Sequence, residues 1–233
     1  MSTYHFYTRF FPIFLVLLPI YLLSIPFCVD VENTIKYLSI ILLLTGLGLF
    51  LSSLDKNFGK KKEKELWKIW QGAPVEILLN DNTNYIDLKT KDNYHSKLLK
   101  ILPRSREIDF KTISNEEKSH IYQWLVMYLI KQRFSKIDST ELNNKNMVYG
   151  FKRHLWGLRK FGITSLIISI IGYFVYRLKV NNFDLSTLHL SFYLQELILI
   201  IMLFGWVYFI NNSWVKKSAM DYTKLLLSHL DQI

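Results

Sequence analysis

Residues 190–210 read LSFYLQELILIIMLFGWVYFI, an apolar run whose single charged side chain is Glu196. A helix of about 20 residues crosses the roughly 30 Å hydrocarbon core of a bilayer. Three further runs have a similar length and character: Phe10–Val29, Ile35–Leu54 and Phe161–Leu178. These segments must be helices, because a lone strand would leave its backbone groups unpaired in lipid. We therefore predict a mainly α membrane protein with four transmembrane helices.

The composition excludes several other classes of protein. Hydrophobic residues make up 50% and aromatic residues 15% of the 233 positions, which is too apolar for a disordered chain. The one cysteine, Cys28, excludes a disulfide framework and a cysteine-based metal site. An ordinary soluble domain is also excluded, since much of the apolar content lies in the four long runs.

The first run contains three prolines, Pro12, Pro19 and Pro26, at intervals of seven residues. They lie near one face of a helix, and we expect this helix to be kinked. A cleaved signal peptide is the alternative interpretation of the run. Its leader carries only Arg9 as a charge and no small-residue cleavage site follows Ser24, so we expect a retained span.

The charge distribution predicts the orientation of the chain. Between Ser53 and Lys160 there are 22 Lys and Arg against 13 Asp and Glu, so this segment carries +9 of the net +10. The short connection Val29–Thr34 contains acidic residues and no base. Because basic flanks stay in the cytoplasm, we expect a multi-pass inner-membrane protein with both termini and the central segment on the cytoplasmic side.

Four parts follow from this layout. We predict a transmembrane hairpin at 1–54, a small cytoplasmic domain of α or α+β structure at 55–160, a second hairpin at 161–210, and a cytoplasmic amphipathic tail at 211–233. The tail has an apolar stripe of Leu225, Leu226 and Leu230.

Within the cytoplasmic domain, capping and breaking residues place the expected elements. Ser114 with Glu117 forms a capping box that predicts a helix reaching Phe134. Gly72 and Pro74 end a preceding basic-aromatic helix, and the polar residues 80–84 predict a turn. The other expected helices are Lys60–Gln71, Tyr94–Leu102 and Met147–Lys160.

The motifs of common catalytic sites are missing from the sequence. None of the six histidines has a His or Cys neighbour at metal-ligand spacing, and there is no phosphate-binding glycine loop or nucleophile elbow. The paired carboxylates, such as Glu116 with Glu117, point in different directions on a helix. We therefore expect a non-enzymatic protein without a metal or a cofactor.

The most specific local pattern is the basic-aromatic segment from Tyr149 to Lys160, directly before the third span. One interpretation is an interfacial belt that contacts membrane lipids. The other is a site for a nucleotide-like or other phosphate-rich ligand, with cations on phosphate and an aromatic ring on a base. Glycines in the segment favour close backbone approach or a hinge. The candidate residues for either role are Tyr149, Gly150, Lys152, Arg153, Trp156 and Arg159.

A second candidate site lies in the membrane. Gln195 and Glu196 fall about one and a half turns inside the fourth span if it begins at Leu190. Glu196 could line a pathway, or it could lie at the outer interface and pair with Lys36; both roles stay open. Ser165 and Ser169 of the third span form a small-xxx-small pair that favours close helix packing.

Two motifs carry a family resemblance. They are Trp67-x-x-Trp70-x-Gly72-x-Pro74 and Tyr149-Gly150-Phe151-Lys152-Arg153-x-Leu155-x-Gly157-Leu158. Together they resemble a family of uncharacterised bacterial four-pass membrane proteins, similar in layout to membrane effectors of anti-phage defence. The resemblance implies a cytoplasmic sensing region joined to helices that perturb the inner membrane, and it assigns no site residue.

These observations favour a homo-oligomeric membrane protein. The concrete form that we expect is a channel-like or membrane-disrupting effector gated by its cytoplasmic domain. The alternative is a membrane-anchored scaffold or assembly partner that recruits a soluble cytoplasmic protein.

Overall fold

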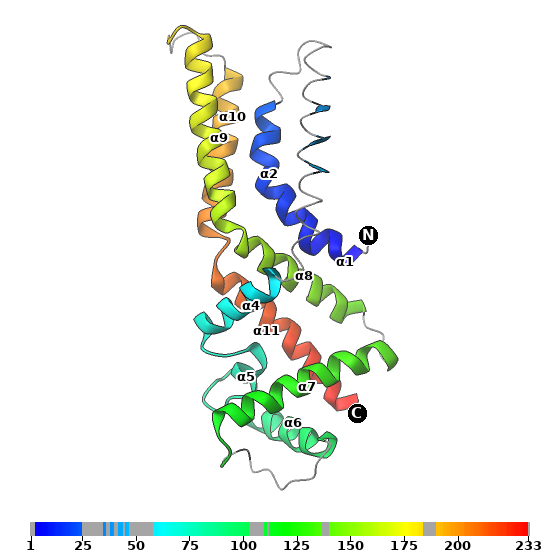
Figure 1. Cartoon of the computed structure of the whole chain (residues 1–233). Helices are drawn as coiled ribbons and strands as arrows, with labels where there is room; N and C mark the ends of the chain where they lie inside the picture. The colour runs from blue at the N-terminus through cyan, green and yellow to red at the C-terminus, as the bar shows by residue number, and fades with distance from the viewer. Residues whose placement is uncertain are drawn as a thin grey trace. The chain divides into compact units, whose positions relative to one another are not determined.

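The computed structural model describes residues 3–24, 58–102, 112–136, 140–183 and 190–232, together with Phe110 and seven residues between 35 and 46. Helices provide the regular structure of this part of the chain, and no strand occurs in it (Figure 1). The prediction of a mainly α protein is therefore confirmed. Of the two forms expected for the cytoplasmic domain, the described residues match the all-α form.

The chain divides into two compact units. The first comprises Met1–Glu63 and Gly150–Val215, and the second comprises Lys64–Tyr149 and Lys216–Ile233. The predicted cytoplasmic domain at 55–160 thus contributes its central part to the second unit and its two ends to the first. Most of the predicted tail at 211–233 belongs to the second unit.

The first unit contains the apolar helices. The chain begins with a short helix, α1 (Thr3–His5), followed by a π-helical turn, η1 (Phe6–Phe10), and α2 (Phe11–Ser24). The two longest helices of this unit are α9 (Arg159–Val180) and α10 (Leu190–Tyr208). Three segments of the described chain are long and apolar enough to cross a membrane: Phe6–Leu23, Arg159–Val180 and Leu190–Tyr208.

The predicted spans can be compared with these helices one by one. The third and fourth spans are confirmed as membrane-length helices, and the fourth begins at Leu190 as expected. The first span starts earlier than predicted, because helical structure extends back through the π-helical turn. The second span, Ile35–Leu54, lies largely outside the described residues. Thr45 within it is described, and its Oγ1 lies 3.1 Å from the Tyr21 hydroxyl of α2.

Two of the three prolines of the first span are described and buried. Pro12 and Pro19 are both buried, while Pro26 lies outside the described residues. Pro19 stands inside α2, and the chain changes direction between α1 and α2 (Figure 1). A π-helical turn and an internal proline both interrupt the regular backbone hydrogen bonds, and each is a known cause of helix bending.

In the first unit, α9 packs against both α2 and α10. Each of the two longer helices buries one narrow stripe and leaves other apolar side chains exposed, including Ile168 on α9 and Ile201 on α10. A membrane helix has this surface when its exposed side faces lipid and its stripe faces neighbouring helices. The stripe of α9 is Gly162, Leu166, Ser169 and Tyr173, and that of α10 is Phe192, Glu196, Leu199 and Trp206.

Gly162 allows α9 and α10 to approach closely. A Cβ atom at this position would overlap the indole ring of Trp206, which is itself buried. Gly172, ten residues later on the same helix, has open space where its Cβ would be. The two glycines therefore have different roles despite their common helix.

We expect Gly162→Ala to destabilise the first unit by about 1–3 kcal/mol, because the added methyl group overfills a packed contact. The matched control is Gly172→Ala, which should be neutral or stabilising, since alanine is the better helix former by up to about 1 kcal/mol. Thermal unfolding of the purified protein in detergent measures both. Equal behaviour of the two variants would contradict the close α9–α10 packing.

The second unit contains helices that range from the six residues of α5 to the 22 residues of α7. Its members are α4 (Phe58–Trp70), α5 (Pro74–Leu79), α6 (Leu88–Ile101), α7 (Asn115–Lys136), α8 (Thr140–Gly157), α11 (Asn212–Ser228) and the 3₁₀ turn η4 (His229–Gln232). The first residues of α4 and α11 and the last residues of α8 belong to the first unit.

Local sequence explains several of these boundaries. Ser114 and Glu117 form the predicted capping box: the Glu117 amide donates to Ser114 Oγ and the Ser114 amide donates to the Glu117 carboxylate, both over 3.2 Å. The helix α4 ends where predicted, with Gln71 and Gly72 at positive φ and the Gly72 amide donating to the Trp67 carbonyl. This is the Schellman arrangement, which satisfies carbonyls left free at a helix end.

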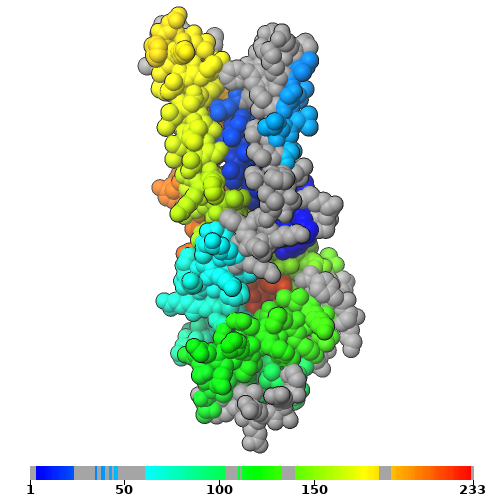
Figure 2. Space-filling view, viewed as in Figure 1, coloured from blue at the N-terminus to red at the C-terminus, as the bar shows by residue number. Residues whose placement is uncertain are grey.

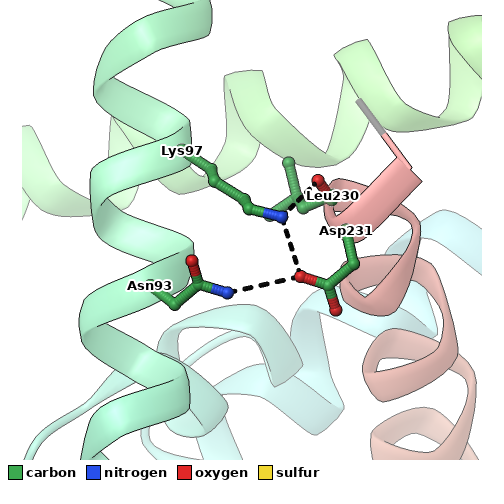
Figure 3. A network of polar contacts seen from close by, with 4 residues as sticks. All are labelled: Asn93, Lys97, Leu230 and Asp231. Atoms are coloured by element: carbon green, nitrogen blue, oxygen red, sulfur yellow. Dashed lines mark hydrogen bonds and ion pairs between the residues drawn. The ribbon is translucent and has the colours of Figure 1, made fainter.

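Most of the C-terminal helix α11 belongs to the second unit. Leu226, Leu227 and Leu230 are almost completely buried. Only a small area of α11 (red) is visible in Figure 2. Lys97 Nζ on α6 lies 2.9 Å from the Asp231 carboxylate and 3.1 Å from the Leu230 carbonyl, and Asn93 donates to the same carboxylate (Figure 3).

Candidate functional site

The strongest candidate site is Glu196 on the buried stripe of α10. Its side chain is only 9% exposed and lies between Phe192 and Leu199 on that stripe. At 1.5 Å per residue, it lies about 9 Å along the helix from Leu190. Its Oε1 is buried and has no hydrogen-bond partner in the part of the chain that the structure describes. The predicted alternative partner, Lys36, lies outside the described residues.

The neighbouring polar side chains bind the backbone of α2. Gln195 Nε2 donates to the Leu22 carbonyl over 2.7 Å, and Ser165 Oγ donates to the Val16 carbonyl over 3.0 Å. Ser169 is 98% buried on the stripe of α9. Side chains of α9 and α10 thus tie both helices to α2, which explains why polar residues are tolerated here.

Gln195 and Ser165 are hydrogen-bonded, whereas Glu196 has a carboxyl oxygen without a partner in the described residues. An ionised carboxylate in apolar surroundings is costly unless a cation or a proton compensates its charge. The arrangement of α2, α9 and α10 therefore presents one acidic group that can take a proton or a cation.

The six candidates of the basic-aromatic segment all have contacts within the protein. In the second unit, Tyr149 is buried and stacks on Tyr222, with 6.4 Å between ring centroids. In the first unit, the Lys152 ammonium lies 4.7 Å from the centroid of the Trp214 ring. An added Cβ at Gly150 would come within 2.8 Å of the Thr8 methyl group, so the close approach expected at this glycine is made by η1.

The remaining candidates bind helix ends and the core of the first unit. Arg153 forms an ion pair with Glu63 at 2.7 Å, and both side chains are largely buried. Trp156 packs against a buried cluster that includes Leu166. Arg159 donates to the Val207 carbonyl over 2.7 Å, at the C-terminal end of α10, where a cation also interacts favourably with the helix dipole. The contacts that the structure gives these three residues hold elements of the first unit together.

His154 adds no positive charge to the segment near neutral pH. Burial is the main reason that the pKa of His154 falls to about 4, and the nearby Arg153 lowers it further. A hydrogen bond of 2.9 Å between Nδ1 and the Gly150 carbonyl acts in the opposite direction. The side chain is therefore neutral at physiological pH, which leaves Lys152, Arg153, Arg159 and Lys160 as the cations.

Sequence reasoning missed a buried polar cluster in the second unit. Lys91 is completely buried, and its ammonium donates to the carbonyls of Asn80 and Thr83 over 2.5 Å each. Nearby on the same helix, His95 Nε2 lies 2.9 Å from the Tyr122 hydroxyl. The sequence contained a signal for the burial of Lys91, because Lys91, Tyr94 and Leu98 have the i, i+3, i+7 spacing of one helix face.

The His95–Tyr122 pair is uncharged near neutral pH. Burial lowers the pKa of His95 and raises that of Tyr122. His95 also stacks on Phe110, with 4.5 Å between ring centroids. The cluster therefore fits a packed polar core. Among the described residues, no group of three or more His, Cys, Asp or Glu side chains could hold a metal ion.

Comparison with known proteins adds no relative: no family model matches the chain, and neither a curated protein nor a solved structure is similar to it.

Proposed function

We propose that the protein is a non-enzymatic, homo-oligomeric membrane protein that conducts cations or protons through a pathway lined by Glu196. The observation that carries the proposal is the buried carboxyl of Glu196, which has an Oε1 without a partner in the described chain. Polar and ionisable residues inside a membrane are costly, and they commonly mark ion or proton pathways.

In this proposal, the structure of the single chain represents a closed state of the pathway. Glu196 lies on a stripe with Phe192 and Leu199, which are 2% and 0% exposed. A few helices cannot readily enclose an aqueous pore alone, so conduction requires several copies and a rearrangement of α9 and α10. The exposed apolar faces of both helices offer surfaces for lipid or for other copies.

Helix continuity supports control by the second unit. The helix α8 is separated from α9 by the single residue Leu158, and α10 is separated from α11 by residues 209–211. Both α8 and α11 cross the boundary between the two units. A movement of the second unit could therefore act on α9 and α10 through α8 and α11, because secondary elements can carry coupling between distant sites.

We also propose the inner membrane as the location, with both termini and the second unit in the cytoplasm, on the basis of the basic flanks. The layout resemblance makes a depolarising effector of anti-phage defence the concrete form. In such an effector, a fraction of the copies opens without a signal, and a cytoplasmic signal that acts on the second unit raises this fraction. The open pathway dissipates the membrane potential.

Expression in bacterial cells that carry a voltage-sensitive dye tests this function. We expect strong expression of the wild-type protein to depolarise the membrane, with an equally abundant single-pass membrane protein as the control. A membrane-anchored scaffold would leave the potential unchanged. An unaltered potential at high abundance, with and without infection by phage, would therefore favour the scaffold.

A further inference from the structure

An exposed aromatic ring lies between two lysines in the second unit. Tyr85 is 45% exposed, and the ammonium groups of Lys216 and Lys224 each lie 6.0 Å from the centroid of its ring. Leu88, three residues later at the start of α6, is 62% exposed. We call these four residues the Tyr85 patch.

The two lysines of the Tyr85 patch lack acidic partners in the described part of the chain. Lys216 and Lys224 belong to α11, and eight residues of helix separate them by about 12 Å along the axis. Both ammonium groups lie over the face of one tyrosine, and a cation–π contact of this kind at an exposed site is weak. Two like charges that share one ring make a favourable place for an anion.

Tyr85 and Leu88 indicate which class of partner binds the Tyr85 patch. An exposed tyrosine beside two lysines, with an exposed leucine three residues along the chain, gives the composition of a membrane-interface surface. In such a surface, aromatic and aliphatic groups enter the headgroup region and lysines meet anionic lipid. A nucleic acid would use the cations and the ring and would leave Leu88 in water. The chain also tethers the patch to the bilayer, since Lys216 follows Tyr208, the last residue of α10, by eight residues.

We propose that the Tyr85 patch binds anionic lipid headgroups, with Lys216 and Lys224 on phosphate groups and with Tyr85 and Leu88 in the headgroup layer. This contact is separate from the conduction pathway. It gives the second unit a docked state whose population depends on the anionic lipid content and falls as ionic strength rises.

The test uses the full-length protein in nanodiscs, with Cys28→Ser and a polarity-sensitive fluorophore on Leu88→Cys. In discs of phosphatidylcholine with phosphatidylglycerol, we expect a blue-shifted emission that disappears in phosphatidylcholine alone. Lys216→Gln and Lys224→Gln should each lower the ratio of docked to undocked protein about fivefold, since a lysine near an anionic surface contributes roughly 1 kcal/mol. The control variant Lys131→Gln removes a positive charge on α7 and should leave the ratio of docked to undocked protein unchanged. The emission of a label on Met127→Cys should not shift between the two kinds of disc.

Four outcomes would overturn the proposal. A blue-shifted emission in both neutral and anionic discs would show that Leu88 is covered by protein, such as a second copy, and an unshifted emission in both would show that the patch does not dock. An equal effect of Lys131→Gln would show that only the overall charge matters. A shift that appears in neutral discs only after addition of a nucleic acid or an acidic protein would assign the patch to that partner.

Discussion

Replacing Lys91 with methionine should destabilise the second unit by about 3 kcal/mol. The ammonium makes two hydrogen bonds in a fully buried position, and hydrogen bonds of charged groups contribute about 1.5–3 kcal/mol each. Methionine keeps the length and most of the volume of the side chain while removing the donors. The Asn80 carbonyl retains the Thr83 amide as a donor at 3.2 Å, so the expected loss lies toward the lower end of the sum.

Hydrogen exchange of the amides in α5 and α6 measures this effect in the full-length protein. A loss of about 3 kcal/mol corresponds to exchange that is roughly 100-fold faster, at 1.4 kcal/mol for each factor of ten. The matched control is Lys89→Met, the same substitution two residues away at an exposed position, which should change stability by less than about 0.5 kcal/mol. Equal exchange in the two variants would show that Lys91 does not hold the residue 80–84 turn.

The elements that could be predicted are those specified by short-range chemistry. The membrane-length helices follow from apolar run length, and the start of α7 follows from the reciprocal bonds of Ser114 and Glu117. The end of α4 follows from Gly72, because its φ of 154° is a conformation that other residues rarely adopt. Each of these depends on a few neighbouring residues.

The features that could not be predicted depend on long-range contacts. Nothing in the sequence near Arg159 shows that its guanidinium binds the carbonyl of Val207, 48 residues later. Likewise, the apolar stripe of α11 predicts an amphipathic helix, but it does not reveal that Asp231 pairs with Lys97. The six-residue helix α5 is too short for periodicity to distinguish it from a buried strand.

For the two candidate sites as well, the sequence predicted the residues and the structure was needed for their contacts. The presence of Glu196 inside a span was readable from the sequence, and its position on the α10 stripe depends on the packing of that helix. For the basic-aromatic segment, composition favoured the lipid role over the ligand role and excluded neither. The structure adds the contacts of Arg153 with Glu63 and of Lys152 with Trp214.

Replacing Glu196 with glutamine should reduce conduction by about tenfold or more. The amide has nearly the same shape as the carboxyl group, but it carries no charge and cannot exchange a proton near neutral pH. A loss of about 1.4 kcal/mol in stabilisation of the passing cation is enough for a tenfold effect. Removal of an ionisable group from the membrane should not lower the abundance of the protein, because the charged form is costly there.

The control for this variant is Glu116→Gln, which makes the same chemical change at an exposed position on α7. It should conduct like the wild-type protein. A fall in abundance or in oligomer size for Glu196→Gln would assign the carboxyl a structural role, such as pairing with Lys36. Unchanged conduction at normal abundance would remove Glu196 from the pathway.

The most direct measurement is ion flux from proteoliposomes that contain only the purified protein. We expect the wild-type protein to release a gradient of protons or monovalent cations, and Glu196→Gln to do so at least about tenfold more slowly, with Glu116→Gln equal to wild type. Absence of flux from correctly inserted wild-type protein, or equal flux from the wild type and Glu196→Gln, would contradict a cation pathway lined by Glu196.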